Sequence, residues 1–173
     1  MIRAVILLTA ILAGSQAKAL ELDAPFENID GGTLAVSQWR GQPVLVVNTA
    51  SRCAFTRQYA GLQALYDAYR DRGLIVLAVP SDDFQQELSS NAEVKEFCEL
   101  QYGIDLPMTG ITTIIGSEAH PFYRSLKAEA GYSPTWNFSK VLIGPRGDLV
   151  ATFGSMVKPG SEALTSAIDE LLR

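Results

Sequence analysis

Residues 44–79 read VLVVNTASRCAFTRQYAGLQALYDAYRDRGLIVLAV, and this stretch decides the fold. Its two ends, 44–49 and 74–79, are continuous runs of β-branched and aliphatic residues, which is typical of strands buried on both faces. Between them, residues 58–70 carry apolar side chains at helical spacing, namely Leu62, Leu65, Tyr66 and Tyr69. The stretch therefore predicts a β-α-β unit, whose crossover should be right-handed.

The residues after this unit predict a helix, a hairpin and a final helix. Asn91 is expected to cap a helix over 91–102. Residues 141–143 and 149–153 flank a Gly-Pro-Arg-Gly-Asp turn, which is a hairpin signal. Ser161 opens the last helix. The apolar faces of the two helices are expected to consist of Val94, Phe97 and Cys98 in the first, and Leu164, Ile168 and Leu171 in the second.

The N-terminal side of the unit completes the expected architecture. Residues 26–39, around Asp30-Gly31-Gly32, predict a small β-hairpin. Taken in order, these elements describe an α/β, thioredoxin-like fold with a central mixed sheet, flanking helices and an N-terminal β-hairpin. Fold alone does not determine function, so the chemistry has to come from particular residues.

Composition excludes several classes of function. The chain has 173 residues, of which 47% are hydrophobic, which suits one globular domain with a sizeable core. It has 14 basic and 19 acidic residues, and its formal net charge of −5 disfavours general nucleic-acid binding. Two cysteines and one histidine are too few for a structural zinc site or a disulfide-dense scaffold. We expect no metal and no cofactor.

Residues 1–19 read as a signal peptide. Arg3 is followed by the apolar run 4–14 and then by Ala17-Lys18-Ala19, the small-x-small pattern that signal peptidases cleave. The run is shorter than the roughly 20 apolar residues of a transmembrane helix, so we expect no stable membrane insertion. Residues 20–173 are then the mature domain, which is expected to be periplasmic or secreted. An uncleaved anchor or a buried helix is the alternative.

The most reactive position is expected to be Cys53. It lies where the buried strand leads into the following helix, the edge at which reactive groups gather in open α/β sheets. Backbone N–H groups at a helix N-terminus favour a thiolate. The alternative is a buried, inert cysteine. No Cys-x-x-Cys motif is present, which disfavours a dithiol reductase, and a Cys/His protease would need His120, which we interpret as structural.

Three separated motifs occur at residues 46–56 (VVNTASRCAFT), 84–88 (FQQEL) and 136–140 (WNFSK). In this order they resemble the active-site segment, the glutamine-glutamate segment and the Trp-Asn-Phe motif of the glutathione peroxidase family. The resemblance extends from about Phe26 to the C-terminus. It departs from the family at Ala54, which replaces a glycine, and in the glutamine segment, which is one residue shorter and lacks Pro-Gly.

The resemblance implies a site of four residues: Cys53 as the peroxidatic thiol, with Gln86, Trp136 and Asn137. Gln85 is a rival for the glutamine, and Gln86 is preferred because Glu87 follows it directly. Amide and indole N–H groups are neutral donors that stabilise a thiolate or a departing oxyanion without titrating. Without the motifs, Trp136 would be interpreted as a core aromatic residue and Asn137 as a turn residue.

The resemblance also implies a role for the second cysteine. Cys98 resembles the resolving cysteine of family members that use thioredoxin, so Cys53 sulfenic acid would condense with it to a disulfide. A thioredoxin-like protein, or glutathione, would then reduce that disulfide. Cys98 should be buried, so the predicted 91–102 helix would have to unwind locally for it to reach Cys53. The alternative is one permanent structural disulfide, a common use of two cysteines in an exported protein.

The expected activity is reduction of hydrogen peroxide and of organic or lipid hydroperoxides. The segment between Leu126 and Trp136 is short, whereas tetrameric family members carry an insertion there, so we expect a monomer with an open site. Two other classes of function are considered. An exported peroxide sensor or thiol–disulfide relay would pass its oxidation to another protein. A non-catalytic thioredoxin-fold module would hold a structural disulfide and leave peroxide unchanged.

Overall fold

The structure is a computed structural model that describes residues 20–173. The predicted signal peptide, residues 1–19, lies outside the described residues. The elements in chain order are β1 (Phe26–Glu27), β2 (Thr33–Leu34), the 3-10 helix η1 (Val36–Trp39), β3 (Val44–Thr49), α1 (Gln58–Tyr69), the 3-10 helix η2 (Arg70–Arg72), β4 (Ile75–Pro80), α2 (Asn91–Tyr102), α3 (Pro121–Ala130), β5 (Lys140–Ile143), β6 (Leu149–Phe153) and α4 (Glu162–Leu171).

A four-stranded mixed sheet in the order β4-β3-β5-β6 forms the centre of the molecule. β3 and β4 run parallel, with Val44 opposite Ile75, and α1 connects them, so the predicted β-α-β unit is confirmed. β5 pairs antiparallel with both β3 and β6, and the second pairing is the predicted hairpin. The N-terminal hairpin is also confirmed, as a separate two-stranded sheet of β1 and β2.

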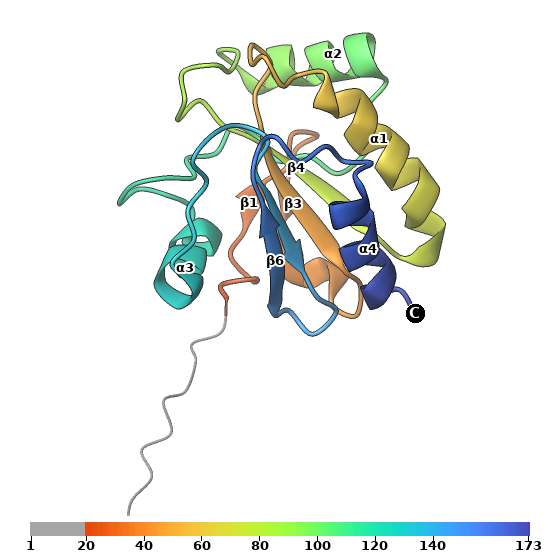
Figure 1. Ribbon diagram of the computed structural model, residues 1–173. Coiled ribbons are helices and arrows are strands. Elements are labelled where there is room, and N and C mark those ends of the chain that lie inside the picture. The colour runs from red at the N-terminus through yellow and green to blue at the C-terminus, as the bar shows by residue number, and fades with distance from the viewer. Residues whose placement is uncertain (1–19) are drawn as a thin grey trace, which may run out of the picture.

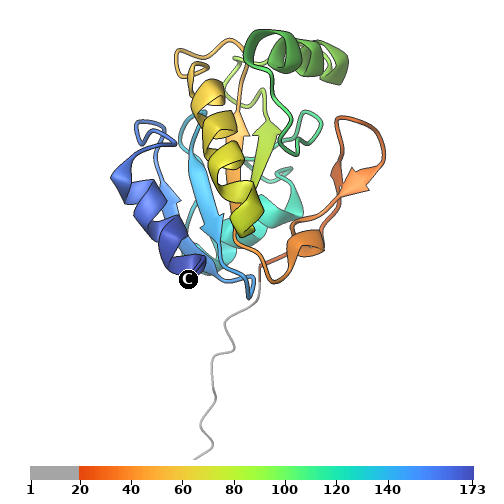
Figure 2. The same cartoon turned by 90° about the vertical axis from the view of Figure 1, so that its right-hand side faces the viewer.

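Helices cover both faces of the sheet, which explains the uninterrupted apolar run in β3. All six residues of β3 are buried. Leu45 and Val47 belong to the apolar cluster under α1, α2 and α4, whereas Val44 and Val46 belong to the cluster under α3 and the N-terminal hairpin. Figures 1 and 2 show α1 and α4 on one face of the sheet and α3 on the other, with α2 across one end.

Two details of the helices differ from the sequence-based expectation. The cap of α2 is Ser90 rather than Asn91, because the Ser90 hydroxyl accepts a hydrogen bond from the backbone N–H of Glu93. α3 is not among the elements expected from the sequence. Pro121 is instead the first residue of α3, where its missing N–H is not needed.

His120 has a structural role at the start of α3. Its ring stacks on Phe26 with 3.6 Å between ring centroids, and its Nδ1 accepts a hydrogen bond from the Phe122 N–H. Burial lowers the pKa of His120. The histidine therefore joins the N-terminal hairpin to α3.

Within residues 20–173, no helix is both long enough and apolar enough to cross a membrane.

Candidate active site

Cys53 lies in a series of turns between the end of β3 and the start of α1. Its side chain is 7% exposed, and its sulfur accepts a hydrogen bond from the Phe55 N–H at 3.4 Å. Its carbonyl oxygen accepts from the Thr56 N–H at 3.0 Å. α1 begins at Gln58, five residues after Cys53, so Cys53 lies between the strand and the helix as expected but does not stand in the first turn of the helix. The Phe55 amide supplies the contact that the helix end was expected to provide.

The segment after β4 holds the Cys53 turn in place. The Arg52 N–H donates to the Gln86 carbonyl oxygen at 2.8 Å, and the Ser51 N–H donates to Glu87 Oε1 at 3.0 Å. Glu87 is 5% exposed, and its Oε1 also accepts from the Leu88 N–H at 2.8 Å. The two residues that precede Cys53 are therefore bonded to two consecutive residues of the glutamine segment.

The structure distinguishes the two candidate glutamines by their contacts. Asn137 Nδ2 donates to Gln86 Oε1 at 3.1 Å, whereas Gln85 is exposed and has a left-handed backbone with φ of 56°. The bond uses the acceptor oxygen of Gln86 and leaves its Nε2 hydrogens for another acceptor. Gln86 is thus the glutamine that the fold brings to Asn137.

The Trp136-Asn137-Phe138 segment is fastened to β3 by Asn48. Asn48 Nδ2 donates to the Trp136 carbonyl oxygen at 3.1 Å, and the Phe138 N–H donates to the Asn48 carbonyl oxygen at 2.6 Å. Phe138 has φ of 63°, an uncommon conformation for a residue other than glycine. A backbone held in such a conformation indicates that the surrounding structure specifies it closely.

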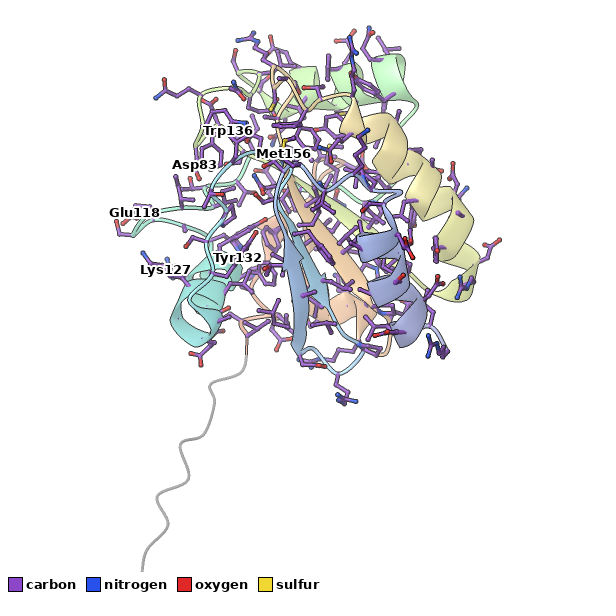
Figure 3. The ribbon with its side chains drawn as sticks, viewed as in Figure 1. Asp83, Glu118, Lys127, Tyr132, Trp136 and Met156 are labelled. Carbon is purple, nitrogen blue, oxygen red and sulfur yellow. The ribbon has the colours of Figure 1, made fainter. Side chains whose placement is uncertain are left out.

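Asn137 and Trp136 have opposite environments. Asn137 is fully buried, and its Oδ1 has no hydrogen-bond partner among residues 20–173. Trp136 is 40% exposed, and its ring lies 5.3 Å from that of Phe84, so it is not a core aromatic residue. Figure 3 shows Trp136 towards the end of the molecule at which α2 lies.

The four site residues are thus brought together only in part. Gln86 bonds to Asn137 directly, and Gln86 reaches the Cys53 turn through its backbone. Within the described residues, no hydrogen bond of standard geometry links the Cys53 sulfur to the side chains of Gln86, Trp136 or Asn137. The expected donors therefore border Cys53 without bonding to its sulfur in this state.

Cys98 is a free thiol on α2, and Cys53 is free as well. Cys98 is 1% exposed and belongs to the same apolar cluster as Cys53. Burial raises the pKa of the Cys98 thiol to about 11, and the neighbouring Tyr59 hydroxyl partly offsets this rise. Cys98 is therefore a poor nucleophile where it lies, and no disulfide joins the two cysteines.

Sequence reasoning missed an open apolar groove beside the Cys53 turn. The groove has a volume of about 850 Å³ and is lined by Phe55, Met156, Val157 and Pro159, together with Arg57 and Lys158. Met156 is 77% exposed, and it lies at the same end of the molecule as Trp136 in Figure 3. The sequence signal for this groove is an apolar Met-Val pair that begins three residues after the last strand.

Comparison with known proteins agrees with the geometry. The family model described as "Glutathione peroxidase" matches residues 22–127. A glutathione peroxidase of Lactococcus lactis is 41% identical over 149 residues, covering 83% of this chain and 94% of its own length. A hydroperoxy fatty acid reductase of Synechocystis is 38% identical, covering 83% of this chain and 90% of its own. The crystal structure of apo Trgpx superposes with a TM-score of 0.70 at 29% identity, covering 90% and 97% of the two chains.

Proposed function

The chain belongs to the glutathione peroxidase family and is a peroxidase, and we propose that Cys53 attacks the peroxide and that Cys98 resolves the product. The observation that carries this proposal is the arrangement around Cys53: a free thiol in the turn before α1, whose two preceding residues, Ser51 and Arg52, bond to the segment that carries Gln86. Asn137 in turn fixes the orientation of the Gln86 amide.

In the first step, the Cys53 thiolate attacks one peroxide oxygen and the O–O bond breaks. Cys53 becomes a sulfenic acid, and the other oxygen leaves as an alcohol or water after taking up a proton. The Phe55 N–H stabilises the thiolate, and the Nε2 hydrogens of Gln86 are available to the departing oxyanion. Neutral donors suit both charges because they do not titrate.

In the second step, Cys98 attacks the sulfenic sulfur, and water leaves as the disulfide forms. Cys98 is on the buried face of α2, so this step needs local unwinding of α2. A thioredoxin-like protein is the proposed reductant, with glutathione as the second candidate, because an intramolecular disulfide is a substrate for dithiol exchange. The active species is proposed to be an exported monomer, periplasmic or secreted.

Fatty acyl hydroperoxides are the proposed bulky substrates. The apolar groove beside the Cys53 turn has room for an acyl chain. Arg57 and Lys158 line it and form no ion pair within residues 20–173, so they are available to a fatty acid carboxylate. The Synechocystis relative is named a hydroperoxy fatty acid reductase, which supports the same substrate class.

Titration of the reduced protein with hydrogen peroxide tests this function. Free thiols and mass are followed for wild type, Cys53→Ser and Cys98→Ser. Wild type should lose both thiols and two mass units, Cys98→Ser should gain an oxygen, and Cys53→Ser should stay unchanged. Survival of the Cys53 thiol in excess peroxide would remove the peroxidase mechanism and favour the non-catalytic module.

Turnover separates the peroxidase from a sensor or relay. With excess thioredoxin-like donor, a peroxidase consumes many equivalents of peroxide. A relay consumes about one equivalent, and its Cys98→Ser variant accumulates a mixed disulfide with a protein partner. Failure of every thioredoxin-like donor, combined with turnover on glutathione, would reassign the reductant.

A further inference from the structure

Lys140, the last residue of the Trp-Asn-Phe-Ser-Lys motif, is a charged residue that the proposed mechanism does not use. It is the first residue of β5 and is fully buried. Its Nζ donates to Gln58 Oε1 at 2.6 Å and to the Val157 carbonyl oxygen. Burial of an ammonium group is unfavourable unless hydrogen bonds compensate it, so these two bonds indicate which parts of the fold the lysine holds together.

Lys140 and Gln58 together tie the segment 155–160, which follows β6, to β5 and to the start of α1. Gln58 is the first residue of α1, and its Nε2 donates to the Ser155 carbonyl oxygen at 2.7 Å. Gln58 therefore bonds to Lys140 through its oxygen and to the segment through its nitrogen. Within residues 20–173, the hydrogen bonds from this segment to β5 or α1 are those made by Lys140 and Gln58.

The segment 155–160 and α1 form two walls of the apolar groove beside the Cys53 turn. The segment contributes Val157 and Pro159 to the lining, and α1 contributes Gln58 and Gly61. The walls touch at one point, because a Cβ added at Gly61 would lie 3.3 Å from Pro159 Cγ, closer than an ordinary van der Waals contact. The hydrogen bonds of Lys140 and Gln58 hold the walls together at a second point.

We propose that Lys140 determines the preference of the enzyme for bulky hydroperoxides, because it holds the segment 155–160 against α1 and so keeps the groove in the shape that accepts an acyl chain. This inference rests on the proposed function, in which fatty acyl hydroperoxides enter the groove. Lys140 is fully buried and does not line the groove, so it is a positioning residue that acts through Gln58 and Val157. Hydrogen peroxide has no acyl chain to place there, so its reaction with Cys53 should not depend on Lys140.

A lysine suits this task better than an apolar residue. Its ammonium group carries N–H donors at the end of a flexible four-carbon stem, so one side chain satisfies acceptors from two different elements. In Lys140→Met, the Gln58 amide oxygen and the Val157 carbonyl oxygen would lose this donor. Among the hydrogen bonds of residues 20–173, the Gln58 bond to Ser155 alone would then tie the segment to α1.

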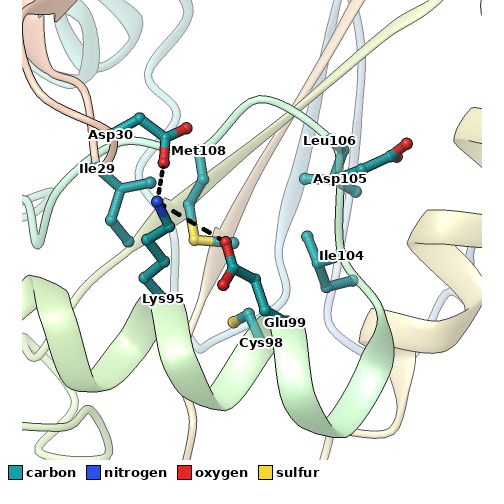
Figure 4. A pocket seen from close by; sticks show the side chains of 9 residues that line it. All are labelled: Ile29, Asp30, Lys95, Cys98, Glu99, Ile104, Asp105, Leu106 and Met108. Atoms are coloured by element: carbon teal, nitrogen blue, oxygen red, sulfur yellow. Dashed lines mark hydrogen bonds and ion pairs between the residues drawn. The ribbon is translucent and has the colours of Figure 1, made fainter.

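A second cavity, beside Cys98, is the rival place for a bulky substrate. It has a volume of about 190 Å³, and Figure 4 shows Lys95 paired there with both Asp30 and Glu99. Charged side chains around this cavity suit an acyl chain less well than the apolar groove does. Lys95→Met is the matched control, because it removes the contacts of a lysine beside the rival cavity and leaves the groove unchanged.

The ratio of two rate constants for Cys53 oxidation tests the inference. Reduced wild type, Lys140→Met and Lys95→Met are each mixed with hydrogen peroxide or with a fatty acid hydroperoxide, quenched rapidly with an alkylating agent and analysed by mass. In Lys140→Met, the rate constant for the fatty acid hydroperoxide should fall at least about ten-fold relative to that for hydrogen peroxide. Lys95→Met should keep the wild-type ratio. A purely structural role of Lys140 would lower both rate constants together and leave the ratio unchanged.

Gln58→Leu gives opposite predictions for a positioning role and for a simple apolar lining. The leucine adds an apolar side chain to the groove, which by itself favours an acyl chain and should raise the ratio. If the bonds of Gln58 hold the walls in place, the same variant should lower the ratio at least about five-fold. Gln58→Leu also tests the inference if Lys140→Met does not fold.

Hydrogen exchange gives a readout that involves no substrate. The Val157 N–H donates to the Gly154 carbonyl oxygen at 3.1 Å, and the Ser161 N–H donates to the Lys158 carbonyl oxygen at 3.0 Å. A segment released from Lys140 should open more often, so the amides of residues 154–161 should exchange at least about ten-fold faster in Lys140→Met than in wild type. Amides of β4 should exchange as in wild type, and Lys95→Met should leave residues 154–161 unchanged.

An unchanged ratio or unchanged exchange in folded Lys140→Met, or a raised ratio in Gln58→Leu, overturns the inference and leaves the peroxidase function intact. A wild type that reacts with hydrogen peroxide but not with a fatty acid hydroperoxide overturns the inference together with the proposed bulky substrate. Absence of any Cys53 oxidation in wild type is a separate outcome that removes the proposed function itself.

Discussion

Replacing Lys140 with methionine should change how the stability of the protein depends on pH. Lys140 is fully buried at the start of β5. Its Nζ donates to Gln58 Oε1 at 2.6 Å and to the Val157 carbonyl oxygen, and it has no carboxylate partner within residues 20–173. Burial lowers the pKa of this lysine from 10.5 to about 8.

The sign of the pH dependence of stability follows from the number of protons that the folded and unfolded states bind. Between pH 8 and 10.5 the unfolded chain holds the proton on Lys140 and the folded chain releases it, so stability rises with pH across that window. Each pH unit above the folded-state pKa contributes about 1.4 kcal/mol. At pH 9.5, about 1.5 units above the folded-state pKa, the contribution is about 2 kcal/mol larger than at pH 7.

Urea unfolding of reduced wild type and Lys140→Met at pH 7 and pH 9.5 measures this contribution. The difference between the two proteins isolates Lys140 from Cys98, whose raised pKa makes stability fall as pH rises. From pH 7 to pH 9.5, the free energy of unfolding of wild type should rise by about 2 kcal/mol relative to that of Lys140→Met. Lys127→Met, at an exposed position of α3, should show no such divergence. A divergence below about 0.5 kcal/mol between wild type and Lys140→Met over the two pH values would refute the reasoning.

Three further predictions concern the site and the fold. Gln86→Ala and Asn137→Ala should each slow oxidation of Cys53, measured by stopped-flow, by about 10- to 100-fold, because a hydrogen bond to a charged group contributes roughly 1.5–3 kcal/mol. Unchanged rates would show that neither amide acts on the reaction. Met156→Glu should lower kcat/KM for a fatty acid hydroperoxide at least about ten-fold more than it lowers kcat/KM for hydrogen peroxide, because it places a charge in an apolar groove. Equal losses of kcat/KM on both substrates would argue against acyl binding in the groove. Gly147→Ala should reduce the free energy of unfolding by about 1–2 kcal/mol, because φ is 85° and the new Cβ would lie 2.5 Å from Leu22 Cδ1. The rate of Cys53 oxidation should not change. A variant as stable as wild type would mean that the turn adjusts without strain.

The sheet was predictable because the sequence of each strand and turn by itself indicates the structure that it adopts. β3 is buried along its whole length, so it reads as an unbroken apolar run, and β5 and β6 flank a turn rich in Gly and Pro. α3 was missed for a physical reason as well. At its start the His120 ring both caps the helix and stacks on Phe26, a contact from far away in the sequence that local propensity does not report.

The candidate site was predictable as a set of residues but not as a set of contacts. The motifs identify Cys53, Gln86 and Asn137, whereas the bond between Gln86 and Asn137 depends on the backbone around Gln85. That residue has a positive φ, which non-glycine residues seldom adopt, so local propensity does not predict it. The choice between two adjacent glutamines is therefore made by a turn conformation that only the folded chain specifies.

The burial of charged side chains is the feature that local sequence predicts least well, because it depends on contacts made only in the folded chain. Glu87 and Lys140 look like surface residues in sequence, yet the fold buries both of them. Both are held by neutral partners, which leaves their charges uncompensated and moves the pKa of each towards neutrality. Packing alone gives no reason to keep such groups, since apolar residues of similar volume are often at least as stable there. The bonds they make give a reason: Glu87 Oε1 accepts from the Ser51 N–H, two residues before Cys53, and Lys140 Nζ joins Gln58 at the start of α1 to the Val157 carbonyl oxygen.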